Sequence, residues 1–414
     1  MFSFHSHSGQ FCKHAKGSLE DVILSAIERR FTTYGLSEHM PRYKPNQLYP
    51  EESHLTTQDL ESTFDQYLLE ARRLQEKYRQ QICLLIGFET EYFGPESIQH
   101  VLNLRQPYRK IPANSHALAM EAAGVARRER EDKISSDLDR NADGEEDAPA
   151  TPTTTHATTT TTTSPSASIS TSATTPTTSS SASTTATLVT LPQVQYIVGS
   201  IHHVRGIPID FSEELYMKAL QEVGEGSWET LFKVFFDEQF EMIKGLEPEV
   251  VGHLDLVRIF FASISGGVQE GQGQKQGQLT EELWELVKRN VDYVIGYGGL
   301  FELNSRAWKK GLRDAYPQRD ILEYILSKGG RLTLSDDSHG PDDVGMFYDP
   351  RLMDYLQEMK VTQVFYLAPV GADMDDRYIT YANAGTWSFQ HVHIRSKSIA
   401  ELRAEMTWPT NTKS

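Results

Sequence analysis

The stretch ICLLIGFETEY, residues 82–92, joins an almost continuous apolar run to two acidic residues, Glu89 and Glu91. An apolar run without alternating polar residues is typical of a parallel strand that is buried on both faces. Parallel strands are joined by crossover helices, so the stretch indicates an α/β fold in which residues 82–89 form an inner strand. We expect its acidic end to lie at the carboxyl edge of the sheet.

Strand-like and helix-like segments alternate on both sides of this strand. Ser18, with Asp21 three residues later, predicts the capped start of one helix, and a longer helix follows Thr57. Further strands are predicted at residues 2–5, 34–37, 196–203, 250–255, 300–304 and 331–337, with helices at 212–223, 281–295 and 319–330. Seven such strands predict a closed or nearly closed barrel. Residues 362–368 have the pattern of one further strand.

Two segments interrupt this pattern. Residues 151–187 contain 27 Ser or Thr among 37 residues and no charged side chain, so they cannot bury enough apolar surface to fold. We expect a disordered Ser/Thr-rich insertion at about 115–190 and a flexible Gly/Gln-rich loop at about 266–278. The prediction is one barrel domain over residues 1–414 that carries both segments.

Composition restricts the class of protein. Two cysteines in 414 residues provide no disulfide framework, which favours a reducing, cytoplasmic location. No stretch approaches the roughly 18 apolar residues that span a bilayer. A net charge of −17 disfavours a nucleic-acid partner, because binding a polyanion requires a surplus of Lys and Arg.

Metal-type ligands follow nearly every predicted strand, where βα barrels place their active sites. The residues at these positions are His5, His7, His39, Glu89, His202, His253, Asp255, Asp336, Asp337 and His339. Each alone is a weak signal, but their coincidence at six of the seven strand ends predicts a site with more than one metal ion. Glu91 and His203 are set aside because each has a better-placed neighbour. The histidines without a strand-end context are interpreted as surface residues: His54, His100, His116, His156, His391 and His393.

Seven motifs in fixed order resemble the polymerase-and-histidinol-phosphatase (PHP) superfamily, specifically its histidinol-phosphatase branch. They are HSHSGQFCKHA, GLSEHMP, GFETEY, GSIHHV, GHLDLVR, FELNS and LSDDSHG. Residues 199–211, GSIHHVRGIPIDF, are similar to the fungal type. The resemblance implies a distorted (β/α)7 barrel and up to three divalent ions of zinc, iron or manganese. It implies nine metal ligands, which are His5, His7, His14, His39, Glu89, His202, His253, Asp337 and His339. We interpret Cys12 as a small packing residue.

The resemblance also implies the reaction, which is hydrolysis of L-histidinol phosphate to L-histidinol and phosphate. Clustered cations would activate a water near Glu89 for in-line attack on phosphorus, with Glu89, Asp337 and His253 as catalytic residues. The residues expected to bind substrate are Arg258, Arg205, Asn304, Lys309 and Arg313. Lys309 and Lys310 could equally form a solvated helical face, and Asp255 is expected to support a ligand from behind.

Two other interpretations stay open at this stage. A PHP-type nuclease or nucleotide phosphoesterase would keep the barrel and its metals, although the acidic net charge opposes it. A non-catalytic scaffold would use the Ser/Thr tract as its working part. The sequence does not fix the oligomeric state.

Overall fold

The computed structural model describes residues 1–106, 110–112, 188–191, 193–261, 279–370 and 390–406. The chain divides into two units, Met1–Ile111 with Thr190–Ser414, and Pro112–Val189. The first unit contains the whole main sheet. The predicted loop at 266–278, nearly all of the predicted insertion, and His116 and His156 lie outside the described residues.

Seven parallel strands form the main sheet, and their spatial order follows the chain. They are β1 (Phe2–Ser3), β2 (Thr33–Leu36), β3 (Cys83–Glu89), β6 (Tyr196–Gly199), β9 (Val250–Val251), β10 (Leu300–Asn304) and β11 (Arg331–Ser335). Just beyond the two edge strands, Ser6 pairs with Ser338 in a parallel bridge, and the amide of His7 donates to the carbonyl of Ser338 at 2.7 Å. The sheet therefore curls into the distorted (β/α)7 barrel that was predicted.

Several strands end earlier than predicted. The segments 196–203, 250–255 and 331–337 leave the sheet after Gly199, Val251 and Ser335. The polar residues that follow lie in loops. Successive side chains of a strand point to opposite faces of the sheet, but side chains in these loops can point in the same direction.

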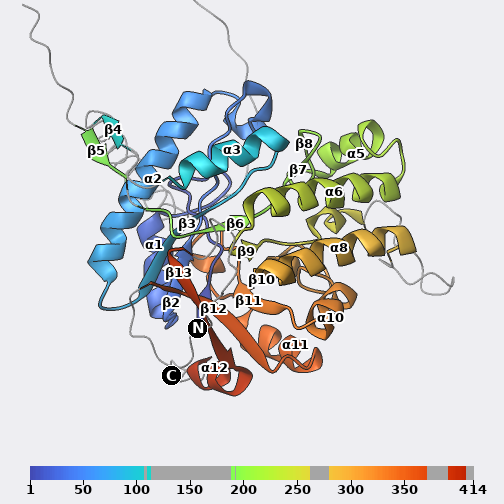
Figure 1. Cartoon of the computed structure of the whole chain (residues 1–414). Helices are drawn as coiled ribbons and strands as arrows, with labels where there is room; N and C mark the ends of the chain where they lie inside the picture. Colours follow the sequence, from blue (N-terminus) through green and yellow to red (C-terminus); the bar gives the residue numbers. More distant parts are fainter. Residues whose placement is uncertain (107–109, 113–187, 192, 262–278, 371–389, 407–414) are drawn as a thin grey trace, which may run out of the picture. The chain divides into compact units, whose positions relative to one another are not determined.

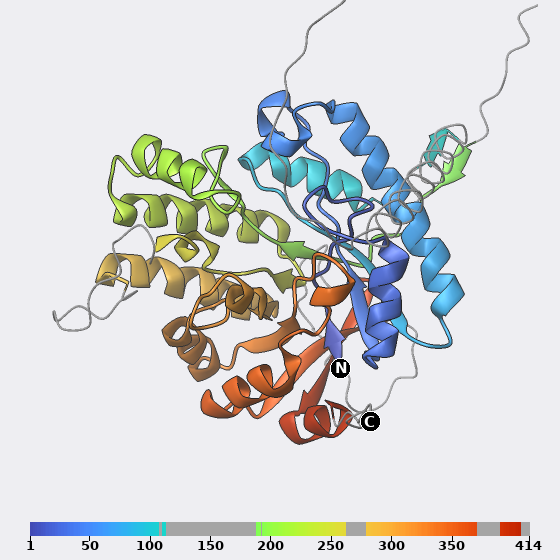
Figure 2. The same cartoon turned by 180° about the vertical axis from the view of Figure 1, so that it is seen from behind.

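Helices surround the sheet (Figures 1 and 2). They are α1 (Leu19–Glu28), α2 (Thr57–Tyr78), α3 (Pro95–Leu104), α5 (Glu213–Glu222), α6 (Trp228–Leu246), α8 (Glu281–Tyr297), α9 (Arg306–Lys309), α10 (Arg319–Ser327), α11 (Met353–Glu358) and α12 (Ile399–Met406). Ser18 and Asp21 form the predicted capping box of α1, and Thr56 caps α2 in the same way. Among the helices described, none is both long and apolar enough to cross a membrane.

Shorter elements complete the structure. Four short 3-10 helices are described, η1 (Pro45–Gln47), η2 (Pro50–Glu52), η3 (Leu256–Arg258) and η4 (Pro341–Asp343), together with a π-helix, η5 (Tyr348–Leu352). The remaining strands are β4 (Lys110–Pro112), β5 (Leu188–Thr190), β7 (His203–Val204), β8 (Ile207–Pro208), β12 (Gln363–Pro369) and β13 (Val392–Ser398). The further strand predicted at 362–368 is β12, which pairs antiparallel with β13 outside the main sheet.

One tyrosine fills the barrel between its strands. Tyr196 on β6 is fully buried, and its hydroxyl donates to the carbonyl of Phe4 at 3.0 Å. Its ring lies against Gly35 and Gly87, where an added Cβ would come within 2.2 Å and 2.4 Å of the tyrosine. Close packing of this kind tolerates no extra carbon atom. The side chain of Tyr196 therefore fits only because β2 and β3 carry glycine at these two positions.

This contact predicts the effect of a single added methyl group. Gly87→Ala should lower the free energy of unfolding of the metal-free protein by about 1–3 kcal/mol, because the new Cβ overlaps the Tyr196 ring. The measurement is urea unfolding followed by circular dichroism. Gly296→Ala is the matched control, since its Cβ on α8 meets nothing within 4 Å and should be neutral or stabilising by up to about 1 kcal/mol. Equal effects of the two changes would contradict this account of the barrel interior.

Candidate metal centre

The nine predicted ligands lie at the carboxyl rim of the barrel. His5 and His7 follow β1, Glu89 ends β3, and Asp337 and His339 follow β11. The others are His14 in the loop before α1, His39 after β2, His202 after β6 and His253 after β9. The structure brings all nine into one region, because parallel strands of one barrel end on the same side.

Glu89 is the centre of this cluster. Its carboxylate is 1% exposed, and five imidazoles surround it. Its Oε1 lies 3.0 Å from His5 Nε2, 3.1 Å from His202 Nε2 and 3.0 Å from His253 Nε2. Its Oε2 lies 3.1 Å from His39 Nδ1 and 3.4 Å from His7 Nε2. The carboxylate of Glu89, at the end of β3, thus contacts residues that follow four other strands, β1, β2, β6 and β9.

Asp337 approaches the same centre from the last strand of the barrel. Its Oδ1 lies 3.7 Å from the Nε2 atoms of His5 and His7, and 3.4 Å from His339 Nδ1. The backbone of Asp337 has a φ of 45°, a left-handed conformation that is rare for residues other than glycine. Strained backbone of this kind gathers at functional sites, and here it turns the carboxylate toward the cluster.

Three carboxylates that were not predicted as ligands support the imidazoles. Glu91 Oε1 is 3.0 Å from His39 Nδ1, and its Oε2 is 3.2 Å from His202 Nδ1. Glu302 on β10 accepts from His5 Nδ1 at 2.6 Å and from the amide of His253 at 2.6 Å. Glu38 Oε2 is 3.7 Å from His7 Nδ1. A signal existed for two of them, because Glu91 and Glu302 share a strand face with Glu89 and Asn304 at a spacing of two residues.

The charges of the cluster favour anionic carboxylates and a mixture of imidazole states. Burial alone would raise the pKa of Glu89, but the neighbouring His5 and His202 hold it well below its usual value. Burial and His7 lower the pKa of His39 to about 3, and burial with Arg306 lowers the pKa of His339 well below its usual range. His39 and His339 are therefore neutral at pH 7, the form in which imidazole binds metals.

A cavity of about 380 Å³ opens over the cluster, a size typical of small-molecule sites. All the predicted ligands except His5 line it, together with Tyr49, Glu51, Asp210, Phe211, Leu256, Ile259, Arg306, Lys310 and Tyr316. Arg306 is half-buried, and its Nη1 donates to the carbonyl of Asp337 at 3.0 Å. Sequence reasoning missed Arg306, although it stands two residues after Asn304.

None of the five predicted substrate-binding residues lines this cavity, and four of them are basic. Arg205 has a side chain 68% exposed beside Glu238, Lys309 pairs with Asp343, and Arg313 is exposed. Arg258 bonds to Asp255 at 2.6 Å and lies 4.8 Å from the ring centroid of Tyr316, so it supports the cavity wall from behind.

The fifth, Asn304, is fully buried beneath the cavity. Its Nδ2 donates to Glu302 and to Asp337 Oδ2 at 3.1 Å each, and its Oδ1 accepts from the amide of Arg306. These bonds use the side chain to orient other site residues. Neither Asn304 nor the four basic residues above is placed where a substrate in the cavity would meet it directly.

The other histidines in the described part of the chain do not line the cavity. His54 is exposed, while His100, His391 and His393 are half-buried. His100 stacks on Tyr43, with ring centroids 3.8 Å apart. His203, which was also set aside, is buried with its Nδ1 3.6 Å from Glu91 Oε2.

Comparison with known proteins agrees with this arrangement. The chain matches the family model of the PHP domain over residues 3–306. The chain belongs to the PHP family. It is 36% identical over 362 residues to the "Probable histidinol-phosphatase" of Schizosaccharomyces pombe, covering 87% of this chain and 88% of that protein. It is 24% identical over 389 residues to the "Histidinol-phosphatase" of Saccharomyces cerevisiae, covering 89% and 91%.

A solved structure supports the fold. The crystal structure of the "putative histidinol phosphatase hisK" from Listeria monocytogenes aligns with a TM-score of 0.53 at 18% identity. The alignment covers 84% of this chain and 98% of that one. At this identity the likeness establishes the shared barrel.

PHP domains are metal-dependent, and the donor atoms of this one fit metal ions. Within the described part of the chain, several buried nitrogen and oxygen atoms lack a hydrogen-bond partner. They are His5 Nε2, both ring nitrogens of His7 and of His39, Glu89 Oε2 and Asp337 Oδ1. Buried polar atoms without partners are costly. Several triads among these residues have one donor atom each within 4.8 Å of the others, such as His5, His7 and Asp337. Metal ions bound among them would satisfy the unpaired atoms.

Glu302 supplies a test of how the ligands are held. In Glu302→Gln, one of the two accepting oxygens is replaced by an NH2 group, which cannot accept a hydrogen bond. That group would face either His5 Nδ1 or the N–H groups of His253 and Asn304. We expect zinc affinity to fall by about 10–100-fold, the usual loss when a partner of a metal-binding histidine is removed. The measurement is competition with a chromophoric chelator. Glu285→Gln, on the exposed face of α8, is the control and should leave the affinity unchanged; an equal affinity in both variants would show that Glu302 does not orient the ligands.

Proposed function

We propose that this protein is a histidinol-phosphatase, which hydrolyses L-histidinol phosphate to L-histidinol and inorganic phosphate. The observation that carries the proposal is a buried ring of imidazoles and carboxylates at the floor of a cavity that two basic side chains border. The names of the two yeast relatives give the same substrate. A phosphate monoester with a small cationic leaving group suits a cavity of this volume and charge.

The proposal includes up to three divalent ions of zinc, iron or manganese. One set of ligands is His5, His7 and Asp337, a second is Glu89 with His202 and His253, and a third is His14, His39 and His339. When bound, such ions neutralise phosphoryl oxygens and acidify a water molecule. The two free cysteines agree with a reducing, cytoplasmic location.

Arg306 and Lys310 would bind the phosphoryl group. Both line the cavity beside Asp337 and His339. Burial and the neighbouring Arg306 lower the pKa of Lys310, and a dianionic phosphate would relieve both effects. These residues take the role first expected of Lys309 and Arg313, because Arg306 at the start of α9 and Lys310 just after its end line the cavity, whereas Lys309 pairs with Asp343 and Arg313 is exposed.

Asp337 is the proposed proton acceptor. Asp337 lines the cavity. Its Oδ1 lies toward His5 and His7 and would hold a metal ion with them, whereas its Oδ2, which accepts from Asn304 Nδ2 at 3.1 Å, would take the proton of the attacking water as oxygen bonds to phosphorus. Glu89 and His253 hold the neighbouring imidazoles in place through their 3.0 Å contact. The bond from phosphorus to the leaving oxygen then breaks, and that oxygen takes the proton held by Asp337, so that histidinol leaves as the neutral alcohol.

Asp210 would recognise the cationic end of the substrate. It follows β8, lines the cavity, and its Oδ1 is buried without a hydrogen-bond partner in the described structure. Phe211, Leu256 and Tyr316 form the apolar wall next to it. An ammonium group can pair with the carboxylate while the carbon skeleton and imidazole of histidinol contact these side chains.

Removing metal ligands should abolish turnover. The double variant His5→Ala with His7→Ala should lose phosphate release from L-histidinol phosphate by more than about 100-fold, since charge-stabilising groups contribute at least that much. Exhaustive chelation of the natural protein should do the same, with recovery when zinc or manganese is returned. His54→Ala with His100→Ala removes two histidines outside the cavity and should keep full activity. Undiminished turnover in the first double variant would refute the proposed site.

Substrate choice should depend on Asp210. In Asp210→Asn, kcat/KM for L-histidinol phosphate should fall by about 10–100-fold, the value of one hydrogen bond between charged groups. The value for phenyl phosphate, which has no amine, should stay unchanged. Asp354→Asn, an exposed change on α11, is the control for both substrates. A parallel loss for the two substrates would show that Asp210 does not read the amine.

A further inference from the structure

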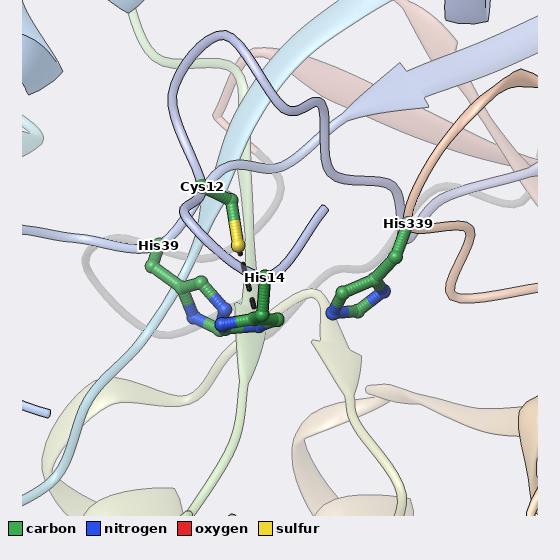
Figure 3. A group of neighbouring side chains, drawn as sticks. All are labelled: Cys12, His14, His39 and His339. Carbon is green, nitrogen blue, oxygen red and sulfur yellow. Dashed lines mark hydrogen bonds between the residues drawn. The ribbon is translucent and has the colours of Figure 1, made fainter. Parts of the chain in front are cut away.

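A cysteine and three histidines meet at the outer edge of the metal centre (Figure 3). They are Cys12, His14, His39 and His339, and one donor atom from each lies within 4.8 Å of the other three. Cys12 Sγ is 3.2 Å from His14 Nε2, and the rings of His14 and His339 are stacked with centroids 5.0 Å apart. Figure 3 shows the sulfur directed toward the imidazoles, with a dashed line to His14.

Backbone hydrogen bonds hold this group in place. The amide of Cys12 donates to the carbonyl of Ser8 at 2.9 Å, and the carbonyl of Cys12 accepts from Ala15. The amide of Lys16 donates to the carbonyl of His339 at 2.9 Å. The loop that carries Cys12 and His14 is thereby fixed to the loop that carries His339, while His39 is held by its parallel bridge to Glu89.

The donor types differ across the centre. Around Glu89 and Asp337 the donors are imidazole nitrogen and carboxylate oxygen, which suit zinc, iron and manganese alike. The outer group replaces the carboxylate with a thiol. Three nitrogens and one sulfur form a four-coordinate set that is typical of zinc, and thiolate ligands disfavour manganese and magnesium.

We propose that Cys12 is a ligand of the ion held by His14, His39 and His339, which makes the outer position a zinc-selective site with three nitrogens and one sulfur. This assignment rests on the metal centre of the proposed function and replaces the packing role first expected of Cys12. When the ion binds, a sulfur–metal bond forms and the thiol proton passes to solvent. No oxidation state changes.

Cobalt substitution tests the sulfur bond directly. The full-length protein loaded with Co²⁺ should show a near-ultraviolet sulfur-to-cobalt charge-transfer band. Cys12→Ser should lose the band and retain about one equivalent less zinc after dialysis. Cys83→Ser is the matched control, because Cys83 is the other free cysteine and stands at the start of β3; it should keep both the band and the zinc.

A second measurement needs no variant. X-ray absorption of the zinc-loaded natural protein should include a sulfur neighbour at about 2.3 Å beside nitrogen and oxygen neighbours at about 2.0–2.2 Å. Absence of sulfur from the zinc environment, or a cobalt band that persists in Cys12→Ser, would overturn the assignment. Failure of the natural protein to hydrolyse L-histidinol phosphate while the band is present would instead reject the substrate and leave the ligand in place.

Discussion

The site depends on one buried carboxylate that several strand ends share. Glu89 ends β3 at the middle of the barrel rim, and imidazoles from the segments after β1, β2, β6 and β9 converge on it. A buried charge is strongly unfavourable unless opposite charges or donors surround it. The strands must therefore stay in register for the charge of Glu89 to remain compensated by the imidazoles. The geometry of the centre thus depends directly on the geometry of the barrel.

The barrel meets this constraint by close packing beneath the rim. Tyr196 occupies the interior against Gly35 and Gly87, and its hydroxyl bonds to the carbonyl of Phe4. These contacts join β1, β2, β3 and β6 below the residues that carry the ligands. Behind the imidazoles, Glu302 and Asn304 fix the orientation of His5, His253 and Asp337 from β10. The site is thus rigid because both its floor and its backing are buried and bonded.

The sequence predicted the barrel and the region of the site more completely than it predicted individual roles. The apolar run at 82–89 and the capping pair of Ser18 and Asp21 act locally, so their structures could be inferred directly, whereas the cap of α2 is Thr56, one residue before the predicted Thr57. Glu302 was missed because only the last residue of its strand was considered, although a spacing of two places it on the same face as Asn304. Arg306 and Lys310 could not be separated from Lys309 and Arg313, because a four-residue helix sets which of them faces the cavity, and its direction depends on tertiary contacts.

The bridge between Ser6 and Ser338 has a consequence for synthesis of the chain. His5 and His7, the proposed ligands after β1, leave the ribosome first, while Asp337 and His339 are made more than three hundred residues later. Contacts so distant in sequence form late and slowly, and domains assemble as units during translation. For most of its elongation, the nascent polypeptide therefore exposes His5 and His7 without the carboxylate of Asp337. The complete proposed metal site forms only when β11, the last strand of the main sheet, has docked.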